Sequence, residues 1–283
     1  MTYRECYEAG RTALAEAGIL EAELDARLLL EYVCHTDRNT LLVHSEREVT
    51  DEERPRYQDL IIKRAERVPL QHLTGIQEFM GLSFQVNEHV LIPRQDTEIL
   101  VEEVLRHLHD GMRVLDMCTG SGCILISLLH YSNDCSGVGV DLSEAALEVA
   151  RENADQLLQT SGDKSKDILF QRSNLFEKVE GQFEIIVSNP PYIESEVIES
   201  LMPEVRLHEP LLALDGGEDG LDFYREIVRG SRTHLTGGGM LFFEIGYNQG
   251  KAVRALLEQS GFTAVEIVQD YAGLDRVVYG TRL

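Results

Sequence analysis

From about Thr97 onward, the chain alternates short apolar runs with segments of helical pattern. The runs that predict strands are "RVLDM" (113–117), "GVGVD" (137–141), "ILFQR" (168–172) and "FEIIVS" (183–188). Helices are predicted over 97–109, from about 122, and over 143–158. Because strands alternate with helices and each strand is a short, mainly apolar run, we expect parallel strands that are buried on both faces. The pattern predicts an α/β fold in which helices cover both faces of a mostly parallel sheet.

The C-terminal part departs from this alternation. After "MLFFEIG" (240–246) and a predicted helix over 248–260, the strands "TAVEIVQD" and "DRVVYGT" are separated only by "YAGL" (271–274). So short a link can join only antiparallel strands. A mostly parallel sheet with an antiparallel last strand is the sheet expected of class I methyltransferases, and it differs from the all-parallel sheet of dehydrogenases.

The N-terminal part has a different pattern. Apolar residues recur at helical spacing in "AELDARLLLEYVCH" (22–35), and Thr50 followed by Glu53 is a capping-box signature for a helix. Short strand patterns then follow between Pro69 and Pro93. We therefore expect a small helical domain over 1–67, a hairpin-like linker over 68–93 and the α/β domain over 94–283. The helical domain contains no catalytic constellation, so it either docks a substrate or serves packing alone.

The charge balance limits the class of partner. The chain has 49 acidic and 26 basic residues, a formal net charge of −23. Binding to nucleic acid relies on clustered Lys and Arg that displace counterions from phosphates. We therefore expect a basic protein partner and no direct contact with nucleic acid.

The cysteines and the apolar runs indicate the compartment. The five cysteines are odd in number, scattered, and include no C-x-x-C pair, so neither disulfides nor a metal site is predicted. The charged opening lacks the apolar centre of a signal peptide, and no apolar run approaches the length of a membrane span. The sequence predicts a cytoplasmic protein, a monomer by default, without membrane association.

A glycine-rich turn follows the first predicted strand of the α/β domain, in "VLDMCTGSGCI" (114–124). Gly120 and Gly122 allow a sharp turn and a close approach of a ligand to backbone N–H groups. Asp141 ends the next strand, where a carboxylate can accept hydrogen bonds from ribose hydroxyls, although a helix N-cap is an equal alternative for it. Leu125 stands where a dinucleotide fingerprint has its third glycine, which favours a nucleoside without pyrophosphate, such as S-adenosylmethionine. Asp116 is expected to brace the loop.

The segment "EIIVSNPPYIESE" (184–196) ends the fourth strand abruptly. Pro190 and Pro191 cannot continue a central strand, so it should end at about Ser188. A simple turn is the plain interpretation. However, the carboxyl ends of parallel strands share one edge of the sheet, so Asn189 is expected beside the glycine-rich turn. This shared location favours a functional corner.

At these residues the chain resembles the HemK/PrmC family, the N5-glutamine methyltransferases of peptide chain release factors. The resemblance rests on the order and combination of "LIPRQDTE" (91–98), "LDMCTGSG" (115–122), "VSNPPYIE" (187–194), "EPLLALDGGEDGLDFYR" (209–225) and "AGLDRVV" (272–278). It implies S-adenosylmethionine as methyl donor. It implies as acceptor the glutamine of the Gly-Gly-Gln loop of class 1 release factors.

The same resemblance assigns residues to roles. The implied cofactor-binding residues are Cys118, Thr119, Gly120, Ser121, Gly122, Asp141, Asn174, Leu175 and Asn189, with Asn174 and Leu175 around the adenine. The implied substrate-binding residues are Asn189, Pro190, Pro191 and Tyr192, of which Asn189 and Pro190 are the catalytic pair. We expect the Asn189 side-chain oxygen and the Pro190 carbonyl each to accept one N–H of the acceptor amide, with no general base required.

Two residues depart from the family pattern. Cys118 stands where the loop usually begins with glycine, which leaves its backbone conformation open. Asn174 stands where the adenine segment usually has aspartate, so it brings a side-chain carbonyl but no charge. Among the flanking motifs, Arg94 and Thr97 either close over the cofactor or cap the following helix, and Glu218 and Asp219 are expected to shape a turn.

Three other functions remain compatible with these motifs. A sister enzyme that modifies a glutamine of a ribosomal large-subunit protein shares the "NPPY" chemistry, so only substrate docking separates the two. An adenine-N6 DNA methyltransferase also uses such a corner on a flipped base, but the charge of −23 disfavours it. A cofactor-binding scaffold without activity is the third.

Overall fold

The computed structural model describes residues 1–158 and 167–283. The chain forms two compact units. The first comprises Met1–Ile76 together with Met202–His208, and the second comprises Gln77–Leu201 together with Glu209–Leu283. The functional division expected from the sequence, into a docking domain, a linker and a methyltransferase domain, stays a prediction.

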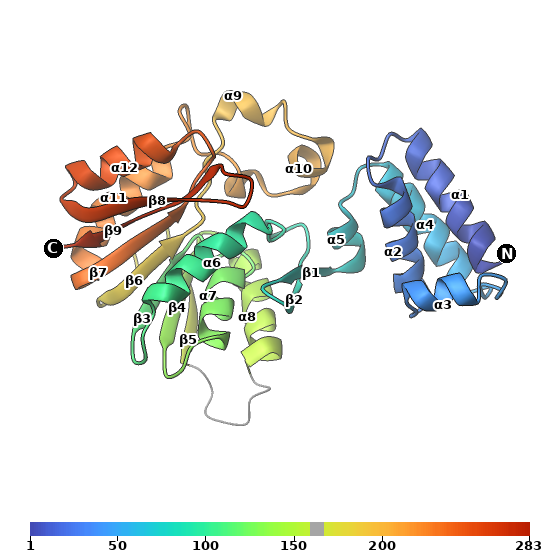
Figure 1. Ribbon diagram of the computed structural model, residues 1–283, viewed down its shortest axis with the longest axis horizontal. Coiled ribbons are helices and arrows are strands. Elements are labelled where there is room, and N and C mark those ends of the chain that lie inside the picture. Colours follow the sequence, from blue (N-terminus) through green and yellow to red (C-terminus); the bar gives the residue numbers. More distant parts are fainter. Residues whose placement is uncertain (159–166) are drawn as a thin grey trace. The chain divides into compact units, whose positions relative to one another are not determined.

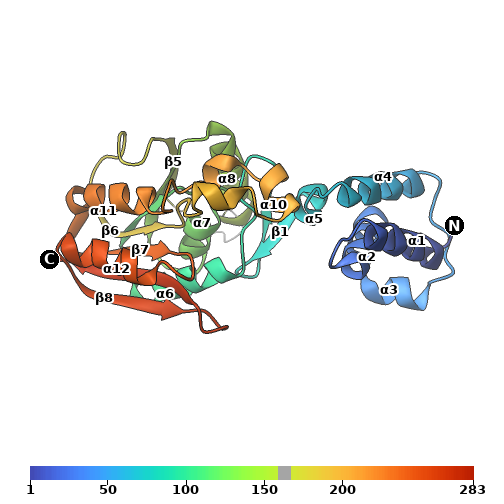
Figure 2. The ribbon, with the colours of Figure 1, turned by 90° about the horizontal axis from the view of Figure 1, so that it is seen from above.

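The first unit is helical. Its helices are α1 (Tyr3–Glu16), α2 (Ala22–Val33), α3 (Arg38–Val43), α4 (Glu53–Ala65), α5 (Leu70–Thr74) and α10 (Pro203–His208). Helices α1, α2 and α4 pack against one another around a core that includes Leu14, Leu29 and Leu30 (Figure 2). The predicted capping box is confirmed: the Thr50 N–H donates to Glu53 at 2.9 Å, and the Glu53 N–H donates to the Thr50 hydroxyl at 3.2 Å.

A buried set of charges lies within this helical unit. Arg64 is 8% exposed, and its Nε donates to Asp25, which is 5% exposed, at 2.7 Å. Arg64 and Arg67 both pair with Glu204, at 3.2 and 3.3 Å. Each buried charge therefore has a partner of opposite sign, which is the condition under which buried ion pairs are tolerated.

A seven-stranded sheet forms the centre of the second unit (Figure 1). Its strands are β3 (Arg113–Met117), β4 (Ser136–Asp141), β5 (Ile168–Arg172), β6 (Phe183–Ser188), β7 (Leu235–Glu244), β8 (Phe262–Gln269) and β9 (Asp275–Arg282). Their order is β5-β4-β3-β6-β7-β9-β8, and β9 runs antiparallel to both of its neighbours. The predicted fold class, including the antiparallel last strand and the end of β6 at Ser188, is confirmed.

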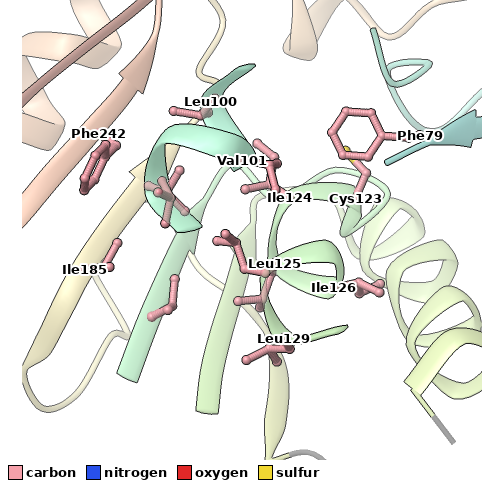
Figure 3. Close-up of a cluster of buried hydrophobic side chains, with 14 of the residues drawn as sticks. Phe79, Leu100, Val101, Cys123, Ile124, Leu125, Ile126, Leu129, Ile185 and Phe242 are labelled. Carbon is pink, nitrogen blue, oxygen red and sulfur yellow. The ribbon is translucent and has the colours of Figure 1, made fainter. Parts of the chain in front are cut away.

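Helices cover both faces of this sheet. One layer consists of α6 (Asp96–His107), α7 (Cys123–His130) and α8 (Glu144–Leu158), and the other of α11 (Asp222–His234) and α12 (Gly250–Gln259). Figure 3 shows side chains of the first interface, which include Leu100, Leu125 and Leu129 from the helices and Ile185 and Phe242 from the sheet. The remaining elements are β1 (Ile76–Phe79), β2 (Leu82–Gln85), α9 (Ser195–Ile198) and the 3₁₀ helix η2 (Leu211–Ala213).

The strand register determines where the functional loops emerge. Met117 of β3 pairs with Val140 of β4 on one side and with Ser188 of β6 on the other. The residues that follow these three strands therefore leave the sheet at one edge. Helix α11 was not predicted, nor were the short helices α9, α10 and η2, and β7 starts at Leu235 instead of at about residue 240.

Among the described residues, no helix has both the length and the apolar character that crossing a membrane requires.

Candidate active site

A cavity of about 190 Å³ opens at this edge of the sheet. The loops after β3, β4, β5 and β6 line it, together with Pro93, Arg94, Thr97, Leu212 and Phe223. Its floor is formed by strand ends, and its walls are mainly apolar with backbone polar groups between them. The arrangement is typical of a ligand site at the carboxyl edge of an α/β sheet.

The loop after β3 is built from left-handed backbone conformations. Cys118, Gly120 and Gly122 have φ values of 61°, 54° and 78°. Cys118, Thr119, Gly120 and Ser121 line the cavity, whereas Gly122 faces inward, where a Cβ would lie 2.8 Å from the Ile126 side chain. The open question about Cys118 thus has an answer: the residue adopts the conformation that glycine prefers, at a cost of about 1 kcal/mol for a residue with a Cβ.

Two aspartates brace this loop. The Thr119 hydroxyl donates to Asp116 Oδ2 at 2.6 Å, and the Gly120 N–H donates to Asp141 Oδ2 at 3.0 Å. Burial raises the pKa of Asp116 to about 7, against the hydrogen bond from Thr119. Asp116 is fully buried and does not line the cavity, in agreement with its expected bracing role.

Asp141 lies at the cavity wall at the end of β4. Its second oxygen, Oδ1, accepts the Ser143 N–H at 2.9 Å, while the Ser143 hydroxyl accepts the Ala146 N–H at 3.2 Å. Ser143, and not Asp141, therefore makes the side-chain cap of α8. Burial raises the pKa of Asp141 against the hydrogen bonds from Ser143 and Gly120. Each carboxylate oxygen keeps a lone pair for a ligand hydroxyl.

The segment after β5 brings Asn174 and Leu175 to the cavity. The Asn174 amide nitrogen donates to Glu177 at 3.0 Å, which leaves its carbonyl oxygen as the acceptor on offer. Leu175 has a φ of 47°, and its carbonyl accepts the Ser173 hydroxyl at 2.7 Å. A leucine in this conformation indicates a segment whose geometry is imposed by its surroundings.

The corner after β6 is held by side chains. Asn189 and Pro191 line the cavity, and the Asn189 amide nitrogen donates to the Thr97 hydroxyl at 3.4 Å. Pro190 is buried and does not line the cavity. Among residues 1–158 and 167–283, no group donates a hydrogen bond to its carbonyl. Tyr192 also lies outside the lining, and its hydroxyl donates to Glu244 at 3.3 Å.

The "GGEDG" segment packs against the backbone of this corner. A Cβ on Gly216 would lie 2.7 Å from Tyr192 Cα, and one on Gly220 would lie 2.4 Å from the Tyr192 carbonyl oxygen. The two glycines are therefore required by close backbone approach. Asp219 accepts the Leu221 N–H at 3.2 Å and pairs with Arg225, as expected for a residue that shapes a turn, while Glu218 is exposed.

The flanking motif "IPRQDTE" contributes two side chains to the cavity, Arg94 and Thr97. One Arg94 nitrogen lies 2.7 Å from both oxygens of Glu209. Thr97 follows the first residue of α6, which begins at Asp96, and so does not occupy its N-cap position.

The buried acids Glu209 and Glu244 were not singled out from the sequence. An acidic residue inside the apolar run "MLFFEIG" was the available signal for Glu244, because a buried charge normally has a partner or a function.

The fold and this site together define a class I methyltransferase. The family described as "PrmC N-terminal domain" matches residues 5–75, and that described as "Methyltransferase small domain" matches residues 94–205. A solved methyltransferase from Pyrococcus furiosus has the same fold, with a TM-score of 0.54 and 17% identity over 72% of this chain and 90% of that chain.

Relatives of known name are similar over the full length. The release factor glutamine methyltransferase of Geobacter sulfurreducens is 42% identical over 280 residues, 99% of this chain and 96% of that protein. The enzyme of the same name from Caulobacter vibrioides is 40% identical over 285 residues, 100% of this chain and 97% of that protein. The chain belongs to the family of release factor glutamine methyltransferases.

Proposed function

We propose that this protein transfers a methyl group from S-adenosylmethionine to the side-chain amide nitrogen of the glutamine in the Gly-Gly-Gln motif of class 1 release factors. The observation that carries the proposal is that the Asn189 corner and the glycine-rich loop line one cavity. Full-length similarity to release factor glutamine methyltransferases supports the assignment of a release factor glutamine as the methyl acceptor. The expected basic partner, the cytoplasmic location and docking by the helical domain belong to the same proposal.

The residues around the cavity fit the cofactor. Asp141 offers a carboxylate to the ribose hydroxyls. Asn174 uses its side-chain nitrogen on Glu177 and keeps its side-chain oxygen as an acceptor. The turn at Cys118, Gly120 and Gly122 lets the backbone approach the ligand. Thr119 and Ser121 add polar lining beside these residues. When bound, S-adenosylmethionine supplies an electrophilic methyl group on a sulfonium.

The protein's contribution is to align and polarise the acceptor. An amide nitrogen is a poor nucleophile because its lone pair is delocalised into the carbonyl. The Asn189 oxygen and the unengaged Pro190 carbonyl each accept one N–H of the glutamine amide, which orients the nitrogen and stabilises positive charge that develops on it. Pro190 and Pro191 restrict the backbone of the acceptor corner, and Tyr192 stiffens it through Glu244. The methylated amide then loses its proton to water.

The direct test is incubation of the protein with labelled S-adenosylmethionine and purified release factor. Label should enter the wild-type release factor and not a variant in which the Gly-Gly-Gln glutamine is alanine. Duplex DNA and the ribosomal large-subunit proteins serve as side-by-side substrates. Label in one of these, and none in the release factor, would refute the proposal.

A second experiment tests the role of Asn189. Asn189→Ala should lower turnover by about 100-fold or more, the usual cost of a lost transition-state hydrogen bond. The dissociation constant for S-adenosylmethionine, measured by calorimetry, should change by less than about threefold, because Asp141 and the glycine-rich loop are intact. Turnover near the wild-type value would contradict the assignment.

A further inference from the structure

Arg94 is the only lysine or arginine that lines the cavity, among the residues that the structure describes. Its side chain is 40% exposed, and its Nη2 donates to both carboxylate oxygens of Glu209 at 2.7 Å. The other guanidinium nitrogens, Nε and Nη1, make no hydrogen bond with any described residue. Because a guanidinium carries five N–H donors, Arg94 has donors left for a ligand in the cavity.

Glu209 holds this guanidinium in place. The Glu209 side chain is 1% exposed, and Arg94 is its only ion-pair partner among residues 1–158 and 167–283. A buried carboxylate is tolerated where a cation neutralises it, so the pair keeps Arg94 at the cavity wall. The residues that follow Glu209, namely Pro210, Leu212 and Ala213, also line the cavity. The ion pair therefore joins two segments of the wall, 93–97 and 210–213.

The order of the strands indicates which part of a ligand Arg94 faces. Asn174 follows β5 and Asp141 ends β4, at one end of the strand order β5-β4-β3-β6. Asn189 follows β6, at the other end. The Thr97 N–H donates to the Arg94 carbonyl at 3.1 Å, and the Thr97 hydroxyl accepts the Asn189 amide N–H at 3.4 Å. Arg94 is therefore linked to the acceptor corner, on the side of the cavity away from Asn174.

S-adenosylmethionine has one anionic group. Its sulfonium carries the ribose, the methyl group and an amino-acid tail that ends in an α-ammonium and an α-carboxylate. With the adenine at Asn174 and the ribose at Asp141, the methyl group has to face Asn189 for transfer. The amino-acid tail leaves the same sulfur atom, so it also starts on the Asn189 side. The N–H groups of a guanidinium match a carboxylate in both geometry and charge.

We propose that Arg94 binds the α-carboxylate of S-adenosylmethionine, and that Glu209 is the positioning residue that holds the Arg94 guanidinium at the cavity wall. This inference rests on the part of the proposed function that assigns S-adenosylmethionine to the cavity. Asp141 and Asn174 select a nucleoside, and Arg94 then selects a nucleoside that carries an amino acid. The rival role for Arg94 is structural, namely neutralisation of the buried Glu209 carboxylate.

A ligand that differs from the cofactor only in the carboxylate separates these two roles. Decarboxylated S-adenosylmethionine keeps the adenosine, the sulfonium and the ammonium. Calorimetry gives the factor by which each protein prefers S-adenosylmethionine over the decarboxylated form. This preference should be about 30-fold smaller in Arg94→Met than in the wild type, because only the first ligand loses a charged hydrogen-bond partner. A purely structural role would weaken both ligands equally, and an unchanged preference would overturn the proposal.

Arg106→Met is the matched control. Arg106 also pairs with a buried carboxylate at 2.7 Å, that of Glu103, whose side chain is 7% exposed, but neither residue lines the cavity. His89 is the other residue of the described lining that can carry positive charge, so His89→Gln is a second control. Both variants should keep the wild-type preference. A loss in either control as large as in Arg94→Met would overturn the proposal.

Glu209→Gln tests the positioning role. The amide keeps the shape of the side chain, but it has no charge and only one oxygen to accept from Nη2. The preference should fall by about fivefold. In Arg94→Met/Glu209→Gln it should fall no further than in Arg94→Met, because Glu209 acts through Arg94. Additive losses would overturn the positioning role. The double variant has no unpaired buried charge, so it also supplies the measurement if Arg94→Met alone does not fold.

These binding measurements are independent of methyl transfer. If the wild type shows the expected preference but methylates no release factor, the proposed function fails and this inference stands. If the release factor is methylated but the wild type and Arg94→Met have the same preference, this inference fails and the proposed function stands.

Discussion

Two loops line the same cavity, and they are rigid for different reasons. The loop after β3 owes its shape to left-handed backbone conformations at Cys118, Gly120 and Gly122 and to the brace that Asp141 makes to the Gly120 N–H. The corner after β6 owes its shape to the proline rings and to buried side chains around Asn189, and offers oxygen atoms. Under the proposed function, the first loop serves the cofactor and the second serves the acceptor amide, so backbone conformation shapes one site and side chains orient the other.

The comparison predicts that substitutions on the cofactor side weaken binding of S-adenosylmethionine, whereas substitutions at the corner after β6 lower turnover. The largest expected effect on binding is that of Asp141→Ala. Asp141→Ala removes the carboxylate from the cavity wall and the brace on Gly120. The dissociation constant for S-adenosylmethionine should rise by about 100-fold, because hydrogen bonds to a charged group contribute about 1.5–3 kcal/mol each. Turnover at saturating S-adenosylmethionine should fall much less than in Asn189→Ala. Calorimetry and initial rates measure the two quantities.

Asp37→Ala is the matched control for this experiment. Asp37 also accepts a backbone N–H, from Thr40 at 2.8 Å, but it lies in the helical unit at the N-cap of α3. Its loss should leave the dissociation constant unchanged. If Asp141→Ala binds S-adenosylmethionine as tightly as Asp37→Ala does, Asp141 is not a cofactor-binding residue.

A smaller effect is expected from the backbone of Cys118. Cys118→Gly relieves the left-handed strain and Cys118→Ala retains it, while both remove the sulfur. Cys118→Gly should therefore be more stable than Cys118→Ala by about 1 kcal/mol. Calorimetric melting temperatures of the two variants measure the difference. Equal melting temperatures would mean that the loop relaxes, and that its shape does not depend on φ at this residue.

The smallest effect is expected at the second loop. Pro190→Ala keeps the carbonyl and releases the ring restraint, so stability should fall by about 0.5 kcal/mol, mainly through the unfolded state. If the proline also stiffens the acceptor surface, turnover should fall by a few-fold as well. Pro55→Ala, at an exposed proline in the first turn of α4, should show the stability loss without the loss of turnover. Unchanged turnover in both variants would mean that the Pro190 ring does not stiffen the acceptor surface, and that the side chains around Asn189 alone keep this corner rigid.

The parts of the fold that depend on local pattern could be predicted. The end of β6 at Ser188 follows from Pro190 and Pro191, and the antiparallel β9 follows from the short link after β8. Helix α11 was not predicted, because its first turn was interpreted only as the end of the motif at 209–225 and the rest of it was not interpreted.

Only part of the site could be predicted from the sequence. The residues around the two loops are marked by glycine, proline and strand ends, and these signals are local. The Asn189–Thr97 hydrogen bond joins residues that lie far apart in the sequence, so no local signal reveals it. The conformation of Cys118 was equally inaccessible, because a residue with a Cβ gives no indication of a left-handed turn.

The ion pairs of Glu204 have a consequence for how this protein can be divided. Because Met202–His208 belongs to the helical unit while the chain on both sides of it belongs to the other, the helical unit is discontinuous in sequence. A fragment that begins at residue 77 would carry Glu204 without Arg64 and Arg67, its ionic partners. No single cut of the chain therefore separates the two units, because the helical unit takes α10 from a later part of the sequence.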